Sequence, residues 1–208
     1  MLGSDLTVDL VVMRVIAGVV IMTVQGVALA AVAQLLGDKG PGYDGRLTAW
    51  PWGHVDLLGL LSMALTGFGW VRPVALDPDQ LRFRRWGLVV VVLTASAALL
   101  LLAALLLLLA TPALRGLDYT AGVTISAFVT EAAQLCVWIA LFSLLPVPPL
   151  PGAHFLAALR ISPPQRWATY LGLALFVLSI LGITRLVVAP AFRLIGPLIL
   201  GADAIALR

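Results

Sequence analysis

Residues 143–154 read Ser-Leu-Leu-Pro-Val-Pro-Pro-Leu-Pro-Gly-Ala-His and directly follow a long apolar run. The segment holds four prolines: Pro146, Pro148, Pro149 and Pro151. Proline lacks a backbone N–H and fixes φ near −65°, so a helix cannot continue through this segment, and an extended, polyproline-like strand is predicted. Non-helical backbone at membrane depth is tolerated only inside protein or against a water-filled cavity. We therefore expect the proline segment to form one wall of a site.

The composition around this segment indicates an integral membrane protein. The chain has 208 residues, of which 62% are hydrophobic and 11% are charged, against about 25% charged residues in soluble domains. The net charge is +3, and the basic residues stand between apolar runs. This placement is typical of topology signals at a membrane surface, so membrane lipids are expected partners and nucleic acid is not.

The apolar runs predict one all-α transmembrane domain over residues 1–208. Between Arg14 and Asp38 lie 23 residues without a formal charge, more than the roughly 20 needed to cross a bilayer. The polar residues 43–56 are expected to form a short β-like excursion at the interface. In total about five or six membrane segments are predicted, with spans at about 11–36, 57–71, 87–111, 122–145 and 167–188, and an interfacial or partial segment at 190–205.

Basic residues predict how the domain is oriented. An Arg-rich loop covers residues 72–85, and basic loops face the cytoplasm in most membrane proteins. We expect a multi-pass protein of the cell (inner) membrane with this loop on the cytoplasmic side. The topology of the tail after Arg185 is left open by the sequence.

Four distinctive segments follow one another along the chain. They are Leu-Leu-Gly-Asp at 35–38, Gly-Arg-Leu-Thr followed by Pro, His-Val-Asp and Leu-Gly over 45–59, Phe-Gly-Trp-Val-Arg-Pro-Val followed by Pro and Leu-Arg over 68–82, and Leu-Leu-Pro-Val-Pro-Pro-Leu with a later Gly over 144–152. In this order they resemble the short form of the site-2 protease family, the intramembrane zinc metallopeptidases. The resemblance implies the family's membrane bundle, with a broken helix at the proline segment and a cleft beside it.

The same register shows that the family's zinc chemistry is replaced. The two histidine ligands fall on Gln25 and Leu29, the glutamate base falls on Gly26, and the aspartate ligand falls on Pro151. A catalytic zinc needs three protein ligands with N, O or S donors, and neither leucine nor proline has a side-chain donor. The resemblance therefore implies a pseudoprotease without catalytic residues at these positions, and no cofactor is expected, zinc included.

Other polar residues could still contribute a site. Glu131 and Gln134 stand one helical turn apart in a predicted span, where a carboxylate is costly and suggests a functional or pairing role, although a position near headgroup level would explain Glu131 equally well. His154 lies three residues beyond Pro151. The candidate binding residues are Ser143, Pro146, Pro148, Pro149, Pro151, His154, Glu131 and Gln134.

These observations predict a catalytically inactive site-2 protease-like protein that acts as an accessory, scaffold or assembly subunit. It would bind transmembrane helices of other subunits in a membrane complex. One alternative is a divergent intramembrane metalloprotease with a relocated metal site built around His54, His154 and Glu131. A second alternative is a binder of a lipid, a quinone or a small solute in the former cleft.

Overall fold

The computed structural model describes residues 7–161 and 164–201. Its described part is helical, and the helices have recognisable start signals. Helix α1 (Val8–Leu35) begins after Thr7, α3 (Leu57–Thr66) after Asp56 and α5 (Tyr119–Phe142) after Asp118. Each of these three side chains accepts a hydrogen bond from a backbone N–H in the first turn, which is how Thr and Asp stabilise helix N-termini.

The remaining elements are α2 (Gly40–Tyr43), a 3-10 helix (Pro51–Gly53), α4 (Arg85–Gly116), α6 (Ala153–Ala158), α7 (Gln165–Ile180) and α8 (Ile183–Leu200). Helices α1, α4, α5 and α8 are long and apolar enough to cross a membrane, while α3 and α7 are shorter apolar helices. The described residues thus contain four helices of spanning length, against the five or six segments expected.

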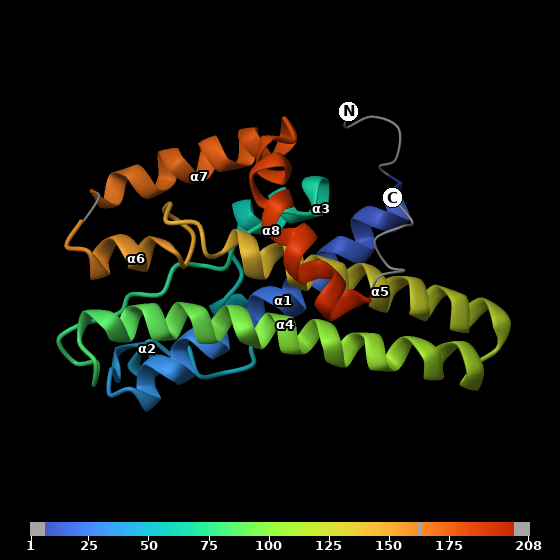
Figure 1. The fold of residues 1–208 in the computed structure, drawn as a ribbon, viewed down its shortest axis with the longest axis horizontal. Helices are drawn as coiled ribbons and strands as arrows, with labels where there is room; N and C mark the ends of the chain where they lie inside the picture. Colours follow the sequence, from blue (N-terminus) through green and yellow to red (C-terminus); the bar gives the residue numbers. More distant parts are fainter. Residues whose placement is uncertain (1–6, 162–163, 202–208) are drawn as a thin grey trace.

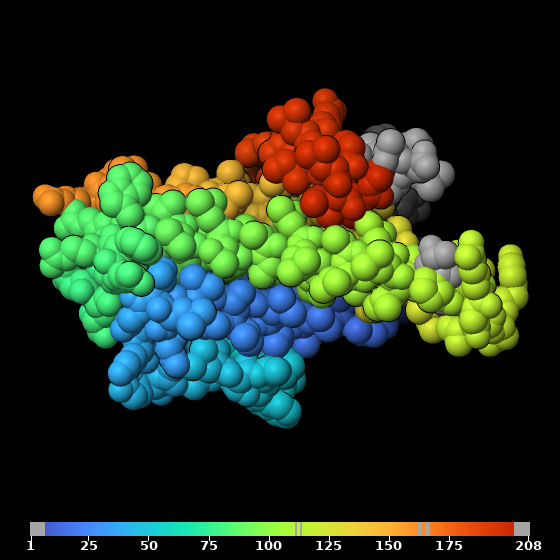
Figure 2. All heavy atoms as spheres, turned by 60° about the horizontal axis from the view of Figure 1, so that its bottom comes forward, coloured from blue at the N-terminus to red at the C-terminus, as the bar shows by residue number. Residues whose placement is uncertain are grey.

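Helix α4 is the central element of the bundle. It packs along α5 and across α1, and α8 crosses α5 (Figure 1). Figure 2 shows α4 with α1 and α2 on one side and α8 on the other. The core between α1, α4 and α5 contains small and medium side chains, such as Ala33, Ala95 and Ala133 with no exposed surface. Small residues allow helices in a membrane to approach closely.

Two helix ends differ from the expected boundaries because of glycine. Helix α3 ends at Thr66 rather than near residue 71, since Gly67 adopts a left-handed conformation at φ 80°. The expected span at 167–188 is interrupted at Gly182, which has a φ of 76°. Helix α8 then runs from Ile183 to Leu200 and contains two prolines. Glycine adopts such φ values without steric cost. The expected partial segment at 190–205 lies within α8 up to Leu200, and residues 202–205 fall outside the described residues.

The polar segment 43–56 consists of turns and the 3-10 helix, and the described residues contain no strand. The β-type pairing of this segment is an isolated antiparallel bridge between Val55 and Val71. Beside the bridge, the N–H of Arg72 donates to the carbonyl oxygen of His54 at 2.7 Å. Arg46 donates to the carbonyl oxygens of Gly53 and Pro73. These bonds fix the polar segment against the start of the Arg-rich loop at 72–85.

The expectation of an extended strand at 143–154 is wrong. The segment folds into consecutive turns that bring its two ends together, and the N–H of Gly152 donates to the carbonyl oxygen of Ser143 at 2.7 Å. A Cβ at position 152 would lie 2.3 Å from the carbonyl oxygen of Leu145. The prolines end α5 as predicted, but the close approach at Gly152 lets the chain form a compact proline loop.

Candidate functional site

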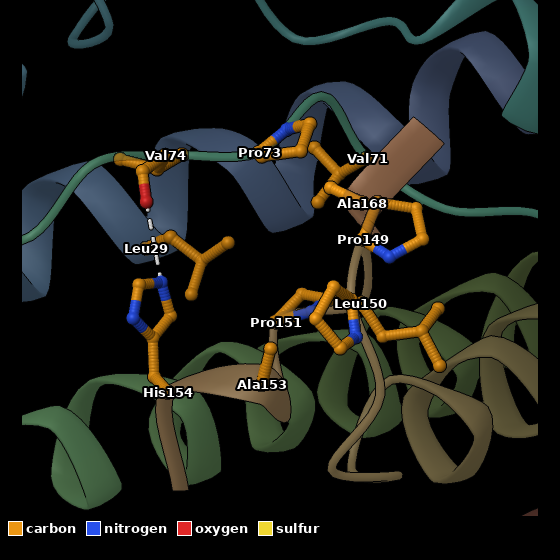
Figure 3. Close-up of a pocket in the computed structure, with 11 residues that line it drawn as sticks. Leu29, Val71, Pro73, Val74, Pro149, Leu150, Pro151, Ala153, His154 and Ala168 are labelled. Atoms are coloured by element: carbon orange, nitrogen blue, oxygen red, sulfur yellow. Dashed lines mark hydrogen bonds between the residues drawn. The ribbon is translucent and has the colours of Figure 1, made fainter. Parts of the chain in front are cut away.

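The proline loop forms one wall of a small cavity of about 130 Å³ (Figure 3). The opposite wall comes from α1 and from the chain that follows the Val55–Val71 bridge, and α7 contributes one residue. The lining residues are Leu29, Val71, Pro73, Val74, Pro148, Pro149, Leu150, Pro151, Ala153, His154 and Ala168.

Two positions that the resemblance assigns to zinc ligands meet at this cavity. Leu29 projects from α1 toward the proline loop, and Pro151 lies on the facing side (Figure 3). Leu29 is 2% exposed and Pro151 is also buried. Neither side chain has a donor atom, so these residues do not fit a zinc ion, which requires N, O or S ligands.

The position of the family's glutamate base is filled by a neighbouring side chain. A Cβ at Gly26 would lie 2.3 Å from Nδ1 of His54 and 2.8 Å from its Cγ. His54 is fully buried, and its Nε2 lies 2.8 Å from the carbonyl oxygen of Thr48. The imidazole therefore occupies the space that a side chain at position 26 would need.

The environment of His54 favours its neutral form. Burial lowers the pKa of His54, and the nearby Arg46 guanidinium acts in the same direction, while the contact with the Thr48 carbonyl opposes them. Its Nδ1 is buried without a hydrogen-bond partner among the described residues. Protonation would place a second buried N–H where no acceptor faces it, and such unsatisfied groups are costly.

Gln25 corresponds to the remaining ligand position. It is 1% exposed, and both atoms of its side-chain amide lack a hydrogen-bond partner among the described residues. Glutamine within a membrane usually hydrogen-bonds to a neighbouring helix, so the sequence gives no sign of this unpaired amide. The amide is buried beside Gly26, and it is not among the residues that line the cavity.

The candidate binding residues separate into different environments. Pro148, Pro149, Pro151 and His154 line the cavity, with Nε2 of His154 3.2 Å from the carbonyl oxygen of Val74 (Figure 3). Pro146 is exposed and outside the lining.

Ser143 supports the proline loop from within the bundle. It is buried, and its hydroxyl donates to the carbonyl oxygen of Ala140 at 2.8 Å and lies 3.1 Å from the hydroxyl of Ser96 in α4. This pair joins the end of α5, where the loop begins, to the central helix.

Glu131 and Gln134 belong to a second polar group. Glu131 pairs with Arg14 of α1 at 3.4 Å, and the two side chains are 12% and 11% exposed. A small pocket there is also lined by Gln134, Trp138 and Arg185, and the Arg185 guanidinium lies 5.5 Å from the centre of the Trp138 ring. Glu131 is thus an ion-pair partner between α1 and α5, apart from the cavity lining.

The residues of the proposed relocated metal site are not brought together. Among the described residues there is no group of three or more His, Cys, Asp or Glu side chains placed to hold a metal ion. His54, His154 and Glu131 instead contact Thr48, Val74 and Arg14 respectively. Sequence reasoning missed Arg14 and Ser96, since contacts between distant helices leave no local pattern in the sequence.

Fold and cavity together define a helical membrane protein whose proline loop faces its first helix. In comparisons with known proteins, no family model matches the chain, and no solved structure matches it. One curated protein is similar, the "Putative zinc metalloprotease YwhC" of Bacillus subtilis (strain 168), which is 38% identical over 63 residues. The match covers 30% of this chain and 29% of that protein. This partial similarity and the apolar helices fit a site-2 protease-like family.

Proposed function

We propose that this chain is a non-proteolytic site-2 protease-like protein, and that its cavity receives a side chain from a transmembrane helix of another subunit. In this proposal α3 and α7 also enter the membrane, which gives a bundle of about six segments, and the Arg-rich loop 72–85 faces the cytoplasm. The observation that carries the proposal is the meeting of Leu29 and Pro151 at one apolar cavity. Apolar side chains stand there at the positions that the resemblance assigns to zinc ligands.

The size of the cavity favours a side chain over a whole ligand. Pockets for drug-sized molecules have volumes of roughly 300–1,000 Å³, and this cavity has about 130 Å³. Apart from His154, every side chain in its lining is apolar. An apolar side chain of a neighbouring helix would fill such a space, and the proposed role is accordingly that of an accessory or assembly subunit.

The proposal is tested by photocrosslinking in intact membranes. A photoreactive amino acid replaces Ala153 or Ala168, both in the cavity lining, and Leu105, which is 50% exposed on α4, serves as the control position. We expect one discrete protein adduct from the cavity positions and none from Leu105. Purification in mild detergent should recover the same protein in fixed stoichiometry. Recovery of the bare chain, without adducts, would contradict the proposal.

The same preparation separates the alternatives. Stoichiometric zinc that is lost in His154→Ala would support a metalloprotease with a relocated site. A lipid or quinone adduct at Ala153 and Ala168, without a protein adduct, would support the small-molecule binder.

A further inference from the structure

A second, larger pocket opens at the start of α4, and four arginines surround it. It has a volume of about 520 Å³ and lies between the turn that precedes α4 and the end of α6. Figure 1 shows these two parts at the same end of the molecule. We call it the cationic pocket; its lining residues are Asp79, Arg82, Phe83, Arg84, Arg85, Trp86 and Arg160.

The positive charge of the cationic pocket is largely unbalanced. Four guanidinium groups face one carboxylate, that of Asp79. The Arg84–Asp79 pair has an N–O distance of 4.0 Å, and the two side chains are 77% and 86% exposed. Exposed pairs of this kind contribute little, about 0–1 kcal/mol. The guanidinium groups are therefore available to an external anion.

The backbone places two of these arginines in an uncommon conformation. Among the described residues, the two non-glycine residues with positive φ are Arg84, at 50°, and Arg160, at 67°, and both line this pocket. Non-glycine residues adopt the left-handed region at a cost, and they are often found at functional sites. The two come from segments 76 residues apart in sequence and meet at the cationic pocket.

An apolar stripe leads away from the cationic pocket along α4. Trp86, Val90, Leu93 and Leu101 are 69%, 38%, 49% and 61% exposed, and Ala97 between them is exposed as well. Their spacing of three and four residues places them on one face of the helix. Because α4 is long and apolar enough to cross a membrane, this face would lie against acyl chains in a bilayer, with Trp86 at its interfacial end.

A cationic pocket that continues into an apolar stripe matches an amphiphilic anion. Arginine binds phosphate through paired, charge-assisted hydrogen bonds, and basic pockets at membrane surfaces bind lipid headgroups. We propose that the cationic pocket binds the phosphate of an anionic phospholipid whose acyl chains lie along the apolar stripe. Free inorganic phosphate would use the arginines and leave the stripe without a role.

The test is lipid retention by the full chain, measured by native mass spectrometry after exposure to equimolar phosphatidylglycerol and phosphatidylcholine. Wild type should retain phosphatidylglycerol preferentially. Loss of two charge-assisted contacts in Arg84→Gln/Arg160→Gln should reduce that retention about tenfold or more, equivalent to about 1.4 kcal/mol or more. The matched control is Arg115→Gln/Arg193→Gln, which removes the same charge from exposed positions outside the pocket.

Three results would overturn the proposal. They are equal retention of the two lipids by wild type, unchanged retention in the pocket variant, and an equal loss in the control variant. Displacement of the lipid by inorganic phosphate at modest excess would identify a free-phosphate site instead. If Arg84→Gln/Arg160→Gln does not fold, Arg82→Gln/Arg85→Gln tests the same pocket with both left-handed residues intact.

Discussion

Gly26 and His54 are two residues whose packing restricts what position 26 can hold. A side chain at position 26 and the imidazole of His54 compete for the same space, since a Cβ at Gly26 would lie 2.3 Å from Nδ1. Replacing the glycine by the family's glutamate would thus require His54 to move from a buried position. The packing between α1 and the polar 43–56 segment therefore leaves no room for a side chain at position 26 while His54 stays in place.

Gly26→Ala should therefore destabilise the protein. Overpacking a filled interior typically costs about 1–3 kcal/mol, and the melting temperature in detergent should fall accordingly. The matched control is Gly53→Ala, because a Cβ at Gly53 meets no atom within 4 Å. Equal melting temperatures for the two variants would show that His54 gives way easily and that the space at position 26 is not restricted.

Acidification should also destabilise the fold through His54. Burial lowers the pKa of His54 in the folded state, so the folded protein binds fewer protons than the unfolded chain. The stability that the fold gains by keeping His54 neutral is fully present above the pKa of histidine in the unfolded chain, about 6.5. It is lost as the pH falls from there through the lower pKa of His54 in the folded state. Melting curves at neutral and mildly acidic pH should show this loss in wild type and a smaller one in His54→Gln. An equal pH dependence in both proteins would exclude His54 as its source.

At the scale of elements, two polar contacts join helices that are distant in sequence. Arg14 and Glu131 connect α1 to α5, and Ser96 and Ser143 connect α4 to the beginning of the proline loop. Both lie among apolar surfaces that could otherwise slide or rotate against each other. The two contacts therefore fix how α1 and α5, and α4 and α5, are positioned along each other.

The Arg14–Glu131 pair is expected to be strongly coupled. Removal of one partner from a fully buried pair costs about 3–5 kcal/mol, and this part-buried pair should cost less. Arg14→Met and Glu131→Gln should each lower the melting temperature, and the double variant should lose less than the sum of the two. Additive losses in this double-mutant cycle would show that the two side chains contribute independently of each other.

At the scale of the whole molecule, the two ends of α4 offer a test of the predicted orientation in the membrane. The Arg-rich loop precedes it, and Leu117 follows it before α5 begins. If α4 crosses the bilayer, these two ends lie on opposite sides. Asp79→Cys and Leu117→Cys place thiols at exposed positions at the two ends, whereas the native Cys136 is buried.

A membrane-impermeant maleimide applied to intact cells should label Leu117→Cys and leave Asp79→Cys unlabelled until the cells are opened. This result follows if basic loops remain in the cytoplasm. The reverse pattern would invert the predicted orientation, and labelling of both positions in intact cells would argue against a spanning α4. The unmodified chain serves as the control for background labelling at Cys136.

The sequence by itself determined the membrane class, the long helices and the end of α5 at the prolines. These features follow from local properties: apolar runs of sufficient length, capping side chains such as Thr7 and Asp118, and prolines without an N–H. The resemblance to site-2 proteases also assigned Leu29 and Pro151 to ligand positions, and the two residues line one cavity.

The tertiary structure alone decided how those positions are used. It placed His54 against Gly26, paired Glu131 with Arg14, folded the proline segment into a loop rather than a strand, and gathered Arg84 and Arg160 around one pocket. The sequence could not predict these contacts, because each joins segments whose proximity depends on how the helices pack. Packing is set by the summed contacts of many apolar side chains, and no local pattern records that sum.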